Sequence, residues 1–110
     1  MESILNSIKK LLGIDESYTH FDPDIIMHIN SVFMTLSQIG VGPAEGFMIE
    51  DDLSTWDEFV SEGENLAAIK SYMYMKVRLL FDPPTNSTHM KAMEDSIREY
   101  EWRLNIEAES

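Results

Sequence analysis

Apolar residues recur every three or four positions along most of this chain, which is the spacing of amphipathic helices. The segment from Leu66 to Phe81 carries two such series. One series contains Leu66, Ile69, Met73, Val77 and Leu80, and the other contains Ala68, Tyr72, Met75 and Leu79. Because a surface helix needs only one apolar stripe, two stripes predict packing on both sides. We therefore expect a central helix near residues 65–81, ending before Pro83, which lacks a backbone N–H.

A single apolar stripe predicts a short helix over residues 2–12, with Gly13 as its C-terminal stop. The stripe contains Ile4, Leu5, Ile8, Leu11 and Leu12. A helix of this length is marginally stable alone, so it must pack on something. Two partners remain open, namely its own bundle or a neighbouring subunit, and Ile4 and Ile8 are therefore candidate interface residues.

Two longer helices are each predicted with one apolar stripe. One begins at Asp22, which we expect to act as N-cap ahead of Pro23, and runs to about Ile39. The other spans residues 87–106 and leaves a frayed tail at 107–110.

Glycine and proline interrupt residues 40–54, which we expect to form a long irregular loop. Residues 47–49 could form one short strand, although no hairpin partner is evident. A short helix capped by Ser54 or Thr55 follows, with Trp56 on its apolar face. The chain is thus predicted to be one all-α domain over residues 1–110, a bundle of four to five helices.

Charge is distributed unevenly. The chain has 8 Lys and Arg against 20 Asp and Glu, a net charge of −12. No Lys or Arg lies between Leu11 and Ile69, so this middle segment carries the whole excess of acid. A protein that grips phosphates needs a basic stripe, so we expect no specific nucleic-acid binding. The acidic segment could simply be a solvated surface, meet a basic partner, or face DNA that must slide past.

Catalytic and metal sites find little support in the sequence. Cysteine is absent, and no glycine-rich phosphate loop follows a strand. Asp24 and His28 are spaced i, i+4, but two ligands are too few for a closed zinc site. The run from Glu50 to Asp52 lacks the spacing of a calcium loop. We expect no enzymatic activity, no metal and no cofactor. No apolar run reaches the roughly 20 residues that span a bilayer, so we expect no membrane partner.

The segments DPDIIMHINSVFMTLSQIGVGP, IKSYMYMKVRLLFDPP and EYEWRLN resemble, in this order, the head–tail connector (adaptor, or head-completion) proteins of tailed bacteriophages. The likeness is to the version found in phages and prophages of Gram-positive bacteria, and residues 69–84 carry its most specific part. The resemblance implies a small all-helical protein that assembles as a ring, typically a dodecamer, beneath the portal at the capsid vertex. It further implies a virion location in the neck, after synthesis in the host cytoplasm, and contact with a stopper or tail-completion protein.

The resemblance identifies no contact residues, so these come from the sequence itself. The candidates for a channel-facing or partner-facing loop are Glu45, Phe47, Glu50, Asp51 and Asp52. Acids in part of residues 45–64 would repel DNA phosphates and let DNA pass. Trp102 falls off the stripe of the last helix and is a candidate partner contact. We also expect the isolated chain to be monomeric, with loop and termini ordering on the portal. The alternative function is a small acidic protein-binding module, for instance a regulator that mimics DNA.

Overall fold

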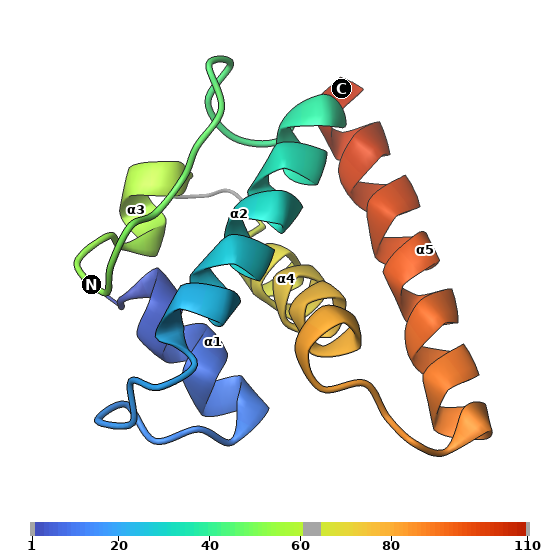
Figure 1. Ribbon diagram of the computed structural model, residues 1–110. Helices are drawn as coiled ribbons and strands as arrows, with labels where there is room; N and C mark the ends of the chain where they lie inside the picture. Colours follow the sequence, from blue (N-terminus) through green and yellow to red (C-terminus); the bar gives the residue numbers. More distant parts are fainter. Residues whose placement is uncertain (1, 61–64, 110) are drawn as a thin grey trace.

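A computed structural model of the chain describes residues 2–60 and 65–109 and shows a compact bundle of α-helices (Figure 1). The helices are α1 (Ile4–Leu12), α2 (Asp22–Gln38), α3 (Trp56–Phe59), α4 (Leu66–Phe81) and α5 (Ser87–Glu109). The all-α prediction is confirmed. Residues 47–49 are loop, and no strand is present in the two described ranges.

Helix α4 lies at the centre, as its two apolar stripes predicted. It contacts α1, α2 and α5, which surround it (Figure 1). Tyr72, Met73 and Val77 in the middle of the helix are completely buried. Leu80 was wrongly included in the buried stripe, because it is 54% exposed in the last turn of the helix. Tyr72 belongs to one stripe and Met73 and Val77 to the other, so both stripes of the helix contribute buried side chains.

Helix α1 packs on its own bundle. Ser3 caps its N-terminus by accepting a hydrogen bond from the Asn6 amide, and Gly13 ends it with φ of 82°. The predicted glycine stop is therefore confirmed, since a left-handed residue at this position strongly favours glycine. At the other end, the Ile4 amide donates to the Ser54 carbonyl at 3.0 Å, which ties α1 to the segment that enters α3.

Helix α2 begins where predicted, but the predicted role of Asp22 as N-cap is wrong. The cap position belongs to Phe21, and no side chain caps the helix there. The Asp22 carboxylate instead pairs with the Lys9 ammonium at 2.8 Å. An ion pair with a buried cation stabilises the fold more than a cap hydrogen bond that water can replace, so the carboxylate turns towards Lys9. The helix ends at Gln38, next to Gly40 with φ of 91°.

Helix α5 is a single outer helix whose apolar stripe faces the bundle, as predicted. Met93, Ile97 and Leu104 are buried along that stripe. The helix continues to Glu109, three residues beyond its expected end at 106, so residues 107–109 of the expected tail are helical, and residue 110 lies outside the described residues. A Cβ added at Gly40 would lie only 3.2 Å from the Ala108 Cβ, so this extra turn packs against the end of α2.

Candidate functional site

The long loop between α2 and α3 is fixed by one side chain of α2. The Asn30 amide nitrogen donates to the Ile49 carbonyl at 2.9 Å, and the Asn30 oxygen accepts from the Ile49 amide at 2.8 Å. Asn30 thus satisfies both backbone groups of Ile49 as a neighbouring strand would. Ile49 itself is buried. The irregular loop predicted for this region is present, and it is tied to the bundle at one defined point.

The five loop residues that the sequence singled out do not lie in one environment. The acids are exposed, and these are Glu45, Glu50, Asp51 and Asp52. Phe47 points inward, with its ring 5.1 Å from that of Phe33 and 5.4 Å from that of Phe59. The acids therefore provide the accessible surface, while Phe47 anchors the loop. The acids at 62 and 64, part of the segment proposed to face DNA, lie outside the described residues.

A groove lies beside this loop that the sequence did not predict. It has a volume of about 730 Å³ and runs between the outer face of α2 and loop residues 45–48. The three methionines that line it are strongly exposed, and the exposed fraction of each residue is 58% at Met27, 66% at Met34 and 71% at Met48. The signal was present in the spacing of Met27, Ser31 and Met34, which follow the helical repeat on the face opposite to the buried stripe.

The three candidate interface residues divide in the same way. Trp102 is 66% exposed on α5, so its indole is available to a partner. Ile4 and Ile8 are both completely buried between α1 and the rest of the bundle. Of the two packing partners considered for the first helix, the structure shows its own bundle. Ile4 and Ile8 therefore offer no surface to another chain in this fold.

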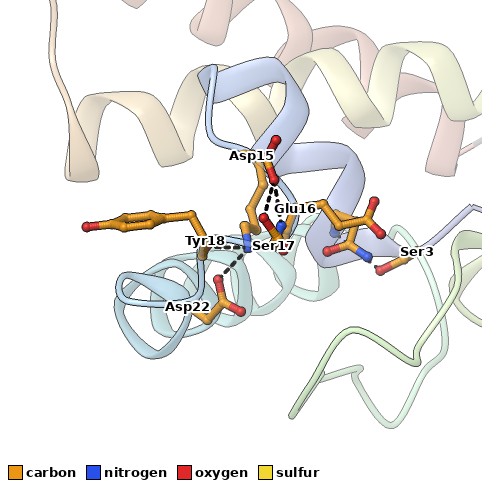
Figure 2. Close-up of polar contacts among 8 residues, drawn as sticks. Ser3, Asp15, Glu16, Ser17, Tyr18 and Asp22 are labelled. Carbon is orange, nitrogen blue, oxygen red and sulfur yellow. Dashed lines mark hydrogen bonds and ion pairs between the residues drawn. The ribbon is translucent and has the colours of Figure 1, made fainter.

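Lys9 is the most unusual polar residue of the described chain, with only 1% of its surface exposed. Its ammonium donates to the carbonyls of Glu16 at 3.0 Å and Tyr18 at 2.8 Å, and it pairs with Asp22 at 2.8 Å. Figure 2 shows these three residues converging from the α1–α2 connection and the start of α2. The two carbonyls accept hydrogen bonds from the ammonium, whereas Asp22 Oδ1 balances its charge as an ion pair without hydrogen-bond geometry. The cluster holds the connection against the end of α1, which is a structural role.

The same connection has a second local fixture. The Asp15 carboxylate accepts hydrogen bonds from the Ser17 hydroxyl at 2.6 Å and from the Ser17 amide at 2.8 Å (Figure 2). These two bonds favour the charged carboxylate and hold the pKa of Asp15 below its usual value. Because Asp15 is fully exposed, its shift is a feature of the turn rather than of a reactive pocket.

A polar contact joins α4 to α5 inside the bundle. The Tyr72 hydroxyl donates to the Glu101 carboxylate at 2.7 Å, and the Lys76 ammonium lies 3.7 Å from the same carboxylate. Burial raises the pKa of Tyr72, and the hydrogen bond to the negatively charged Glu101 raises it further. A tyrosine held protonated in this way fastens two helices, and it is not poised as an acid or base near neutral pH.

None of the contacts described above forms a catalytic or metal-binding site. Within residues 2–60 and 65–109, no group of three or more His, Asp and Glu side chains is placed to hold a metal ion. No described helix is long and apolar enough to cross a membrane. The features that are built and accessible are therefore surfaces: the acidic loop, the methionine groove and the face of α5 that carries Trp102.

Comparison with known proteins identifies one family. Residues 4–110, nearly the whole chain, match the family described as phage connector protein. No curated protein and no solved structure matches the chain.

Proposed function

Because the chain belongs to the phage connector protein family, we propose that it is a head–tail connector that docks beneath the portal as a ring. The ring extends the DNA channel towards the stopper or tail-completion protein. The chain acts in the neck of the virion, after synthesis in the cytoplasm of a Gram-positive host. The family match over residues 4–110 is the observation that carries this proposal, and it supports an assembly role rather than catalysis.

The charge of the accessible loop fits passage of DNA. Glu45, Glu50, Asp51 and Asp52 are exposed, and no cation lies between Leu11 and Ile69 to neutralise them. Carboxylates that face a channel repel DNA phosphates, so the polymer passes without binding. Asn30 fixes the loop at Ile49, which keeps these acids on one side of the bundle.

Binding to the portal tests the proposal most simply. Portal rings from the phage or prophage that encodes this chain are mixed with the purified protein and sedimented. We expect the protein to sediment with the portal in a fixed stoichiometry. Without the portal the protein is expected to be a monomer, and light scattering measures this. Absence of the protein from the portal fraction at any concentration tested would reject the proposed function.

The channel orientation requires a separate experiment. Replacement of Glu50, Asp51 and Asp52 by Lys places three cations on the loop without touching a buried side chain. In particles assembled with this variant, DNA packaging or ejection is expected to slow, because the cations bind passing phosphates. The matched control changes three exposed acids away from the loop and from α5, namely Glu16, Asp24 and Asp82, to Lys. Equal DNA passage in both variants would show that the loop does not face the channel.

A further inference from the structure

The methionine groove between α2 and the loop is an unusual surface for so acidic a chain. Its walls are Met27 and Met34 on α2 and Met48 on the loop, and all three are exposed by more than half. Ser31 lies between the two helix methionines and donates its hydroxyl to the Met27 carbonyl at 3.1 Å. Because Ser31 is small and its hydroxyl is already hydrogen-bonded, the surface between the two methionines is hollow and largely apolar. Methionine side chains adapt their shape to an inserted group, as they do at pliable binding surfaces.

A ridge of complementary character lies on α5. Lys91, Asp95, Arg98 and Trp102 follow one another at steps of four, three and four residues, and Ile106 comes four residues later, so all five line up along one side of the helix. The exposed fractions are 77% for Lys91, 66% for Arg98 and 66% for Trp102. This side faces away from the stripe that packs on α4. The ridge therefore presents a large aromatic side chain with Arg98 next to it and with Asp95 between Arg98 and Lys91.

A positive charge next to Trp102, that of Arg98, can meet a negative charge in the groove, that of Glu45. Of the eight Lys and Arg residues, the exposed ones are Lys10, Lys91, Arg98 and Arg103, so α5 carries three of four. The groove is lined by Glu45 and by no cation, and the whole segment between Leu11 and Ile69 has none. Lys91 and Arg98 also pair with Asp95 along the helix, but at such exposure these pairs are weak and can exchange partners. Complementary charge of this kind favours one partner and one orientation.

We propose that the methionine groove is the docking site for α5 of a second copy of this chain, with Trp102 inserted between Met27, Met34 and Met48. Arg98 of the inserted helix then lies towards Glu45 of the receiving chain. The inference rests on the proposed function, because it names the surfaces through which neighbouring subunits of the connector meet.

The positions of the two surfaces determine the type of assembly. Helix α5 lies on one side of the bundle, and the loop that borders the groove lies beyond α2 on the other side (Figure 1). A contact between two different surfaces is heterologous, so each subunit receives one neighbour and is received by another. Such contacts produce rings or open chains and cannot stop at a dimer.

Cross-linking tests this geometry cleanly, because the natural chain contains no cysteine. Gln38→Cys places a thiol on the groove wall, and Glu99→Cys places one beside Trp102, leaving the methionines and the tryptophan intact. The two single variants are mixed at high concentration, free and on portal rings, and treated with a short thiol-specific cross-linker. Thr19→Cys, exposed on the α1–α2 connection, replaces Gln38→Cys in the control.

We expect the Gln38→Cys and Glu99→Cys chains to cross-link to each other at least about tenfold more than the Thr19→Cys control, since a well-placed aromatic anchor contributes at least a tenfold change in affinity. One chain that carries both cysteines should produce a ladder of oligomers. Trp102→Ala in the Glu99→Cys chain should remove the cross-link, while Trp102→Phe should retain most of it. All these positions are exposed, and circular dichroism verifies that each variant is folded.

Two outcomes would overturn the inference. Cross-linking of Gln38→Cys chains to one another instead would mean that two grooves face each other across a two-fold axis. Cross-linking no stronger than in the control, free and on portal, would mean that α5 does not enter the groove. The portal fraction of the same samples separates this result from the proposed function. Portal binding without the cross-link rejects only the groove contact, whereas a cross-link without portal binding rejects only the portal role.

Discussion

Lys9 gives the most demanding test of the folding account, because nothing in its position suggests a buried cation. Replacement by Met keeps the length of the side chain and removes the ammonium. The change leaves the carbonyls of Glu16 and Tyr18 without their donor and the Asp22 carboxylate without its counter-ion. Lys10 is next to it in the same helix and exposed, so Lys10→Met is the matched control.

The expected cost follows from the exposure of the partners. Removing one member of a buried ion pair costs about 3–5 kcal/mol, since the other charge remains without compensation. Asp22 retains 21% of its side-chain exposure, and the two carbonyls belong to an exposed connection that water can reach. We therefore expect Lys9→Met to lower the free energy of unfolding by about 2–4 kcal/mol. Lys10→Met loses only an interaction with the helix dipole, about 1 kcal/mol at most.

Urea denaturation followed by circular dichroism measures both changes. A loss of this size removes a large part of the roughly 5–15 kcal/mol that stabilises a small domain. The midpoint of thermal unfolding should fall by about 8–30 °C, since 1 kcal/mol corresponds to about 4–8 °C in a domain near this size. A double-mutant cycle with Asp22→Asn should give a coupling of at least about 1 kcal/mol. If Lys9→Met cost no more than Lys10→Met, the cluster around Lys9 would not hold the connection.

Four further substitutions test three other parts of the fold. Asn30→Ala should cost about 1–3 kcal/mol through two lost hydrogen bonds and should abolish hydrogen-exchange protection of the Ile49 amide, whereas retained protection would contradict the clamp. Gly42→Ala and Gly46→Ala share φ of 90°, but only at Gly42 would the new Cβ clash with the Phe59 ring of α3. Thermal melts should therefore show Gly42→Ala to be the more destabilising by about 1–3 kcal/mol, and equal costs would contradict that contact. The folded state raises the pKa of Tyr72, so the stability that its protonated hydroxyl contributes is complete below about pH 10 and is lost as the pH rises above that value. Urea melts of Tyr72→Phe should therefore show a smaller alkaline loss of stability, and an unchanged loss would refute the assignment.

The sequence predicted the helices because their signals are local. Two apolar stripes identified α4, and Gly13 ended α1 as predicted. Helix bounds depend on spacing and terminal residues, which can be read within a few turns. The sequence did not predict that α5 continues beyond residue 106. Ala108 lies next to Gly40 there, a contact between residues far apart in sequence.

The face of α1 was predicted less well for a related reason. Leu11 was assigned to the buried stripe and is 50% exposed, whereas Lys9, assigned to no stripe, is buried. The helix is rotated so that Lys9 follows Leu5 at i+4 on the packed side. A cation there requires acceptors, and these come from a connection whose path a sequence pattern does not specify. Asp22 was predicted to be an N-cap for the same reason, because the sequence does not show that its carboxylate lies next to Lys9.

The surfaces were predicted in part. Exposure of Trp102 and of the acidic loop residues follows from their position off the apolar stripes. The methionine groove was missed because it needs two elements, the outer face of α2 and the loop that Asn30 holds beside it. Only the fold brings Met48 next to Met27 and Met34.

The central claim is that this chain is a structural component of the phage neck. The most direct measurement is an electron-microscopic reconstruction of particles produced by the phage or prophage that encodes it. We predict a ring of five-helix subunits between the portal and the stopper or tail, with α5 of each subunit against the methionine groove of the next. Fully infectious particles that contain no copy of this chain would contradict the claim.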